Sequence, residues 1–176
     1  MRAIVLLILI FCSATIYSQT KVRNIGDALQ LGVPLSAFAY AEVSGDRKGS
    51  IQLLKSLAVQ TSSTIILKRV FNRKRPNGQN YSFPSGHTSL AFVGSTFFWK
   101  RYGWKRGVPA TVLATFVAFS RVYGDDPRHH VSDVFAGAGL GALSALIFTR
   151  RRVNHGNISV IGDTSFVGLK YSYSFR

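Results

Sequence analysis

The sequence predicts an all-α protein, an antiparallel helical bundle of about five helices that follows an N-terminal signal segment and precedes a short C-terminal β-hairpin. Three observations support this fold class. Between residues 26 and 150, long stretches are rich in apolar residues and helix formers. The connections between these stretches are short and contain Gly, Pro, Asn and Asp, which favour turns. After residue 157 the pattern changes to the alternation that is typical of β-strands.

Residues 1–18 have the features of a secretory signal peptide. A basic residue precedes an apolar run over residues 3–17, and small polar residues follow it. The run is shorter than the ~20 residues that a membrane-spanning helix needs, so we expect cleavage near residue 18. An uncleaved signal anchor is the alternative, because Ile16 departs from the small-x-small pattern of cleavage sites. Cys12, the single cysteine, excludes an internal disulfide and a cysteine-based metal cluster.

Five helical segments are expected after the signal segment. Apolar content and helix breakers place them at about 26–43, 48–71, 87–102, 108–123 and 130–150. No repeat or low-complexity linker divides them, so residues 19–156 are predicted to form one helical domain. Residues 157–176 are predicted to form the terminal hairpin, with its turn at Gly162-Asp163. Because an isolated hairpin is marginally stable, we expect it to pack on the helices, on a partner or at a membrane surface.

The composition indicates a membrane protein that attracts anions. Twenty-two Lys and Arg residues against seven Asp and Glu residues give a net charge of +15, which favours phosphorylated substrates and anionic lipid headgroups. Nucleic acid is not an expected partner, because no nucleic-acid-binding module accompanies the charge. A hydrophobic content of 47% is high for a soluble domain, yet low for a chain that lies mostly within a membrane. We therefore expect an integral membrane protein, with a bundle that rests on the membrane as the alternative.

Three polar blocks interrupt the apolar sequence. The first extends from Lys68 to Arg75-Pro76, the second is Pro84-Ser85-Gly86-His87, and the third extends from Ser120-Arg121 to Asp133. Together they supply three fixed cations, a Ser-Gly turn, histidines and a carboxylate. This set of groups suits a site that holds a phosphate and attacks it.

In order and spacing, these blocks resemble the three motifs of the type 2 phosphatidic acid phosphatase (PAP2) superfamily. This superfamily includes lipid phosphatases, bacterial non-specific acid phosphatases and vanadium haloperoxidases. The first family motif, Lys, six residues, Arg-Pro, matches without adjustment, and the second, Pro-Ser-Gly-His, is intact. The third has two extra residues here between Arg121 and His129, while the interval from His129 to Asp133 keeps the family spacing. The resemblance covers residues 68–133 and implies a PAP2-like helical bundle.

The chemistry of single residues agrees with a phosphate site. Lys68 offers a compact charge, whereas Arg75 and Arg121 offer planar, bidentate recognition of phosphate oxygens, and the resemblance implies the same roles. Ser85 is expected to cap a helix whose free N–H groups favour an anion. Gly86 would allow the backbone to approach the phosphate closely.

His129 and Asp133 would share one face of a helix, because they are four residues apart. A carboxylate bonded to one ring nitrogen fixes the tautomer and leaves the other nitrogen free to attack phosphorus. His130 competes with His129 for this position, since it lies three residues from Asp133. The resemblance implies that His129 is the nucleophile, that it forms a phosphohistidine, and that His87 protonates the leaving group. The implied mechanism requires no metal ion and no other cofactor, although vanadate would occupy the phosphate site in a haloperoxidase.

Antiparallel threading of the helices brings the three blocks to one end of the bundle. A helix that ends near Lys68 is followed by one that begins at His87 on the same side. Arg121 then ends a helix and His129 begins the next one there. The opposite end collects the basic residues Arg47, Lys48, Lys100, Arg101, Lys105, Arg106, Arg150, Arg151 and Arg152. By the positive-inside rule, that end would be cytoplasmic and the motif end would face the periplasm or exterior.

The predicted function is hydrolysis of a phosphomonoester or pyrophosphate of a lipid, in a bacterial cell envelope, through a phosphohistidine. Candidate substrates are phosphatidic acid, phosphatidylglycerophosphate, isoprenoid pyrophosphate and the phosphate of lipid A. Two alternatives stay open: a soluble periplasmic acid phosphatase of broad range, and a non-catalytic protein that holds anionic lipid. The motifs select none of the candidate lipids and leave the oligomeric state open.

Overall fold

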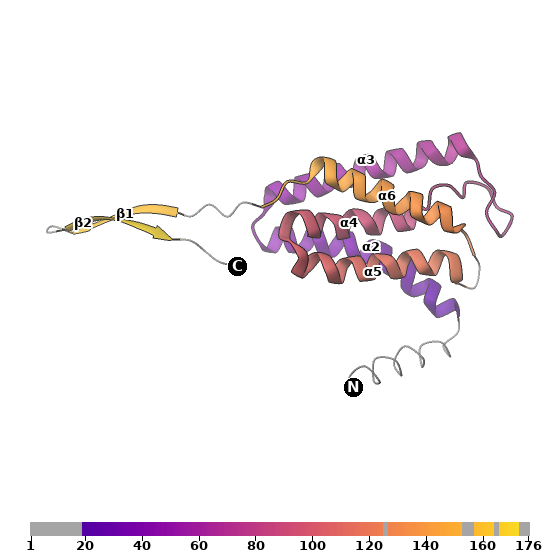
Figure 1. Cartoon of the computed structure of the whole chain (residues 1–176), viewed down its shortest axis with the longest axis horizontal. Coiled ribbons are helices and arrows are strands. Elements are labelled where there is room, and N and C mark those ends of the chain that lie inside the picture. The colour runs from indigo at the N-terminus through magenta and orange to yellow at the C-terminus, as the bar shows by residue number, and fades with distance from the viewer. Residues whose placement is uncertain (1–18, 125–126, 153–156, 164–165, 173–176) are drawn as a thin grey trace, which may run out of the picture.

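Helices form the body of the molecule, as the sequence predicted (Figure 1). The computed structural model describes residues 19–124, 127–152, 157–163 and 166–172, so the predicted signal peptide lies outside the described residues. The described helices are α2 (Gln19–Val43), α3 (Arg47–Phe71), α4 (Gly86–Tyr102), α5 (Trp104–Tyr123) and α6 (Val131–Phe148). Two strands follow, β1 (Asn157–Asp163) and β2 (Phe166–Ser172).

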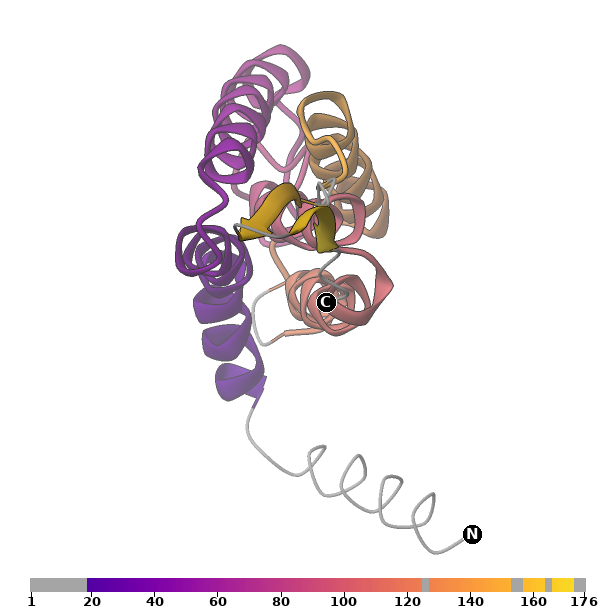
Figure 2. The ribbon, with the colours of Figure 1, turned by 90° about the vertical axis from the view of Figure 1, so that its left-hand side faces the viewer.

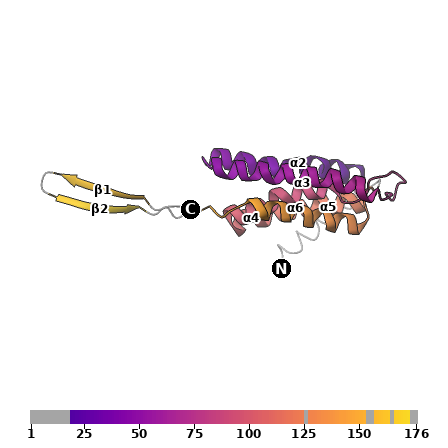
Figure 3. The same ribbon diagram turned by 90° about the horizontal axis from the view of Figure 1, so that it is seen from above.

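The two strands pair antiparallel, with Asn157 opposite Ser172 and Asp163 opposite Phe166. They lie beyond the end of the bundle (Figure 3). Among the described residues, neither strand contacts a helix. The expectation that this segment packs on the helices is therefore not met by the described strands.

Two helices begin several residues earlier than predicted. α5 begins at Trp104 and contains Pro109, which the prediction had placed in the first turn of the helix. Gly103 makes the earlier start possible, because its φ of +87° lets a single residue separate α4 from α5. α2 begins at Gln19, ahead of the predicted residue 26, in a stretch whose mixed polar residues give little helical periodicity.

Helix α4 is the centre of the bundle and contacts each of the other four described helices. An end-on view shows the other helices arranged around it (Figure 2). Its side chains Val93 and Phe97 are fully buried in the main core cluster together with Leu53. Gly94 lets α2 approach closely, since a Cβ at this position would lie 2.8 Å from the backbone of Pro34.

A buried ion pair fixes the end of the bundle at which α3 begins. Asp46 is the N-cap of α3 and accepts a hydrogen bond from the backbone N–H of Gly49 at 3.0 Å. The Nε of Arg101, near the end of α4, donates to the same carboxylate at 2.6 Å. Burial alone would raise the pKa of Asp46, but the hydrogen bonds from Arg101 and Tyr102 lower it to about 2. Arg101 also donates to the carbonyl of Arg150 at 2.7 Å, so this pair joins three segments of the chain.

Large apolar side chains also cover the outside of the bundle. Exposed examples from α2, α3, α5 and α6 are Leu31, Leu35, Ile65, Ile66, Val112, Leu113, Phe135, Leu143 and Ile147. Extended apolar surfaces mark contact with lipid or with another protein. Within the part of the chain that the structure describes, α6 alone has both the length and the apolar composition of a membrane span.

Candidate active site

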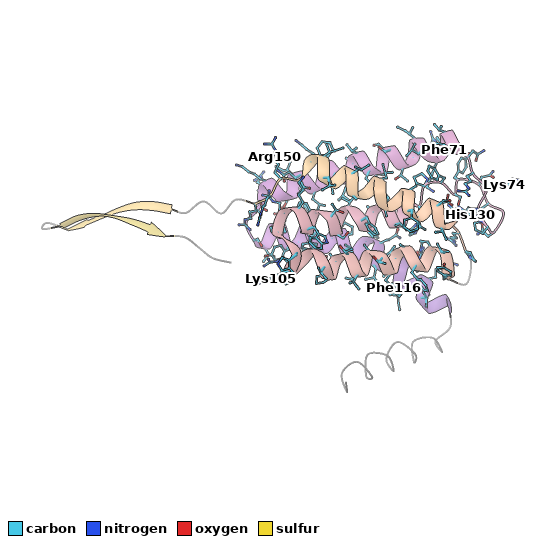
Figure 4. All side chains as sticks on the ribbon, viewed as in Figure 1. Phe71, Lys74, Lys105, Phe116, His130 and Arg150 are labelled. Carbon is cyan, nitrogen blue, oxygen red and sulfur yellow. The ribbon has the colours of Figure 1, made fainter. Side chains whose placement is uncertain are left out.

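The three polar blocks meet at one end of the bundle, as antiparallel threading predicted. α3 and α5 end there, and α4 and α6 begin there (Figure 1). Figure 4 shows Lys74 and His130 at this end, and Lys105 and Arg150 at the opposite end. Hydrogen bonds join all three blocks, and three groups of this end donate to one carboxylate.

That carboxylate belongs to Asp133, which is fully buried in the first turn of α6. Its Oδ1 accepts a hydrogen bond from Arg73 Nη1 at 2.9 Å. Its Oδ2 accepts from Ser82 Oγ at 2.5 Å and from the backbone N–H of His130 at 2.9 Å. The carbonyl of Asp133 also accepts from the backbone N–H of Ser85 at 2.9 Å, which fastens α6 to the second block.

His129 is buried beside Asp133, but the two residues do not share a helix face. The sequence predicted a helix from about residue 130 that would place His129 and Asp133 on one face. The helix α6 begins instead at Val131, with His130 as its N-cap, so His129 precedes it. The loop before α6 nevertheless brings His129 Nδ1 to 3.9 Å from Asp133 Oδ2. The predicted proximity is therefore present, although 3.9 Å is too long for a hydrogen bond.

The two extra residues of the third block are accommodated in the loop between α5 and α6. The backbone N–H of Arg128 donates to the carbonyl of Arg121 at 3.3 Å, which brings the two ends of the loop together. Asp125 and Asp126, which belong to this loop, lie outside the described residues. His129 thus reaches Asp133 despite the longer spacing.

The surroundings of His129 favour its neutral form. Burial lowers the pKa of His129, and the positive charges of Lys68 and Arg75 lower it further. The negative charge of Asp133 offsets only part of these effects, so the pKa falls to about 3. A neutral imidazole carries a lone pair on one ring nitrogen, as a nucleophile requires.

The side chain of His130 has a different partner. Its Nε2 lies 3.2 Å from the carbonyl oxygen of Lys74. Only the backbone N–H of His130 reaches the carboxylate of Asp133. Of the two competing histidines, His129 is therefore the one whose ring lies buried beside Asp133.

Local structure holds the two cations of the first block. Asn72 ends α3 in the left-handed conformation, with φ of 36°, and its N–H donates to the carbonyl of Lys68 at 3.1 Å. The Nζ of Lys68 donates to the carbonyl of Tyr81 at 2.7 Å. Arg75 Nε donates to the carbonyl of Asn80 at 3.2 Å. Both side chains thus help to fix the loop that carries the second block.

Ser85 and Gly86 lie at the start of α4, as predicted, but Ser85 does not cap the helix with its side chain. Its Oγ lies 3.0 Å from Thr88 Oγ1, and no capping hydrogen bond is formed. At Gly86 a Cβ would meet Thr64 at an ordinary 3.4 Å. Packing within the protein therefore does not by itself require glycine at position 86.

A second group of side chains surrounds His87. Its Nε2 lies 3.4 Å from Asp27 Oδ1, and Arg121 Nη1 donates to the same oxygen at 2.5 Å. Arg121 is 2% exposed and also donates to the carbonyl of Arg23 at 3.0 Å and to Ser120 Oγ at 3.1 Å. His87 lies close enough to His129 for its charge to lower the pKa of that ring. The two groups therefore belong to one site.

Three functional-site residues were missed by sequence reasoning: Asp27, Arg73 and Ser82. A signal existed for Asp27, because antiparallel threading places the start of the predicted 26–43 helix at the motif end. Arg73 was hidden in a run of basic residues, and nothing in the sequence distinguished its partner. Ser82 lies two residues before Pro84, and this closeness to the second block was the sole indication in the sequence that it belongs to the site.

The arrangement suits attack on a phosphate. Cations surround a buried, neutral histidine, and a second histidine stands nearby with a carboxylate. Within the described residues, no group of three His, Cys, Asp or Glu side chains is placed to hold a metal ion.

Comparison with known proteins shows a family and a fold that this chain resembles. The model of the PAP2 superfamily matches residues 77–156. A lipid A 1-phosphatase of Helicobacter pylori is 27% identical over 142 residues, which cover 76% of this chain and 70% of that protein. A lipid A 1-phosphatase of Porphyromonas gingivalis is 30% identical over 131 residues, which cover 70% of this chain and 29% of that protein. The crystal structure of Aquifex aeolicus LpxE has the same fold, with a TM-score of 0.63 at 22% identity over 73% of this chain and 83% of that one.

We expect the ring of His129 to stay neutral between about pH 4 and pH 8, because its pKa is lowered to about 3 and protonation needs a pH near that value. The nitrogen resonances of ¹⁵N-histidine-labelled protein, recorded against pH, measure this directly. The resonances of His129 are identified by their loss in a His129→Asn variant. A midpoint near the ordinary histidine value of about 6.5 would contradict the expectation.

Proposed function

Because the chain belongs to the PAP2 superfamily, we propose that it hydrolyses a phosphomonoester or pyrophosphate of a lipid, with residues 19–156 as its catalytic domain. The observation that carries this proposal is the buried, neutral His129 beside Asp133, among the cations Lys68 and Arg75. The names of the relatives, lipid A 1-phosphatases, support a lipid as the substrate.

In the proposed first step, Nε2 of His129 attacks the phosphorus atom. A P–N bond forms, the bond between phosphorus and the lipid oxygen breaks, and a protonated His87 gives its proton to that oxygen. Burial and the charge of Arg121 lower the pKa of His87 to about 4 in the free protein, so the negative charge of the bound phosphate would have to raise that pKa for His87 to enter the step protonated. In the second step, water attacks the phosphohistidine and gives its proton to His87. Inorganic phosphate is released and both histidines return to their starting states.

The phosphate would be held by the cations and by the start of α4. Lys68 and Arg75 would neutralise its charge, and the backbone at Ser85-Gly86 would approach its oxygens. Arg121 would bind it as the third cation. Since Arg121 donates to Asp27 in the free protein, a bound phosphate would have to share or replace that carboxylate.

We expect His129→Ala to abolish phosphate release, because no other described ring lies buried beside Asp133. The matched control is His130→Ala, whose ring contacts the Lys74 carbonyl instead and which should keep most of the activity. Release of inorganic phosphate from a panel of lipid phosphates measures both. A wild-type phosphoenzyme that is trapped at low temperature and absent from His129→Ala would identify the nucleophile. Loss of release in His130→Ala with persistence in His129→Ala would reverse the assignment.

A pocket beside the site supports a substrate with an apolar part. It has a volume of about 340 Å³ and is lined by Phe71, Arg73 and Phe83. The rings of Phe71 and Phe83 meet edge to face, with centroids 4.9 Å apart. Arg73 links this pocket to Asp133 at 2.9 Å. An acyl chain in the pocket would thus leave the attached phosphate near His129.

We expect Phe71→Ser to lower kcat/KM for a long-chain lipid phosphate about tenfold, because an apolar contact of about 1–2 kcal/mol is lost. Activity on p-nitrophenyl phosphate, which has no acyl chain, should stay within twofold. Ile147→Ser is the control, since it removes an exposed apolar side chain from the part of α6 distant from the site. Equal losses on both substrates would favour the soluble acid phosphatase.

The apolar outer surface supports an integral membrane protein, and we propose that the site faces the periplasm or the exterior. At the end opposite the site, basic residues such as Lys105 and Arg151 are exposed, and Trp99 and Trp104 are exposed beside them. Tryptophan is enriched at both interfaces of a membrane, and an excess of basic residues is typical of the cytoplasmic side.

Labelling of single cysteines tests this orientation, in a Cys12→Ser background. An impermeant maleimide should label Gln79→Cys, at the site end, in intact spheroplasts. It should label Arg151→Cys only after lysis, because the membrane shields the cytoplasmic face. The reverse pattern would overturn the orientation and leave the proposed chemistry intact.

A further inference from the structure

Ser82 occupies the space between the two residues of the proposed nucleophilic pair. Its side chain is fully buried. The Oγ atom lies 2.5 Å from Asp133 Oδ2 and 3.5 Å from His129 Nδ1. The direct distance from His129 Nδ1 to Asp133 Oδ2 is 3.9 Å. The hydroxyl is therefore closer to each partner than the partners are to each other.

The backbone holds Ser82 in this position. Its N–H donates to the carbonyl of Arg73 at 2.8 Å, so the loop before α4 is pinned to the end of the first block. Its Oγ also lies 3.4 Å from the carbonyl of Arg128, the residue just before His129. Contacts to both neighbouring segments thus fix the hydroxyl between the ring and the carboxylate.

The carboxylate cannot turn toward His129 without losing other bonds. Arg73 holds Oδ1 at 2.9 Å, and the backbone N–H of His130 holds Oδ2 at 2.9 Å. A rotation that closed the 3.9 Å gap would weaken both bonds around a fully buried charge. Such a loss is costly in a buried site. Asp133 therefore stays at its distance of 3.9 Å and influences His129 without a direct hydrogen bond.

The donor and acceptor roles follow from chemistry. A carboxylate only accepts hydrogen bonds, so at 2.5 Å the hydroxyl of Ser82 donates its proton to Asp133. The Oγ atom then has lone pairs free to accept from an N–H group, and Nδ1 of His129 is the ring nitrogen that faces it. This order places the ring proton on Nδ1 and leaves the lone pair on Nε2.

We propose that Ser82 is a positioning residue that relays the charge of Asp133 to His129, through Nδ1–H, Oγ–H and the carboxylate in series. The role rests on the proposed function, in which Nε2 of His129 attacks phosphorus. When the P–N bond forms, the ring gains positive charge, and its Nδ1 proton is stabilised by Ser82 and Asp133. No proton leaves the relay during the step, so the balance of the reaction is unchanged.

Ser82→Ala tests the relay. We expect kcat to fall about 10- to 100-fold, as for other residues that orient a reactive histidine, with KM changed less than threefold. Ser144→Ala is the matched control, since it also removes a buried serine hydroxyl, one that bonds the Leu140 carbonyl far from the site. Thermal unfolding of both variants checks that the fold is kept. An unchanged kcat in Ser82→Ala would overturn the proposal.

The tautomer of His129 provides a second measurement that needs no activity. In the wild type, ¹⁵N shifts and couplings should show the ring proton of His129 on Nδ1. In Ser82→Ala, they should show a mixture of the Nδ1–H and Nε2–H tautomers. A wild-type ring protonated on Nε2 would overturn the relay. The tautomer measurement does not depend on turnover, so it can be interpreted even if the protein does not hydrolyse lipid phosphates. A negative result for the relay would in turn leave the His129→Ala test of the proposed function unaffected.

Discussion

The buried carboxylate of Asp133 is the point on which the active end of this protein depends. It ties both ends of the loop between α3 and α4 to the start of α6 through Arg73, Ser82 and the backbone of His130. A fully buried charge is stable only while its hydrogen bonds are kept. The α3–α4 loop and the start of α6 are therefore held in place by hydrogen bonds to the same carboxylate, and His129 lies beside it.

The opposite end of the bundle uses a similar device for a different purpose. Asp46 and Arg101 form a buried pair that joins the start of α3 to the end of α4. The hydrogen bonds of this pair go to other groups of the protein, such as the N–H of Gly49 and the carbonyl of Arg150. Between the two ends, α4 packs against every other described helix through a face that includes small residues such as Gly94. Two clusters of buried apolar side chains thus lie between the polar ends, and close packing of this kind keeps the site rigid while the outer surface stays apolar.

Sequence reasoning predicted the features whose causes are local. Helix positions follow from apolar periodicity and from breakers such as Gly103, and the meeting of the motifs follows from antiparallel threading. The partners within the site were not predictable in the same way. Arg73 and Ser82 are chosen by tertiary contacts with Asp133, 60 and 51 residues away, and no spacing rule encodes such a pairing. His129 was expected on a helix because the interval of four suggested one, yet α6 begins only after its N-cap His130, so His129 lies in the preceding loop.

The cations of the site have opposite effects before and after a phosphate binds. In the free protein, Lys68 and Arg75 help to keep the pKa of His129 near 3, which leaves the ring neutral but makes it a weak base. If both cations bind the phosphate as we propose, the charge of that group offsets theirs, and burial is left as the main effect that opposes the negative charge of Asp133. The ring becomes more basic, and so more nucleophilic, only when its target is in place. A hydroxyl between the ring and the carboxylate suits this arrangement, because it fixes the tautomer without drawing a proton onto Nε2.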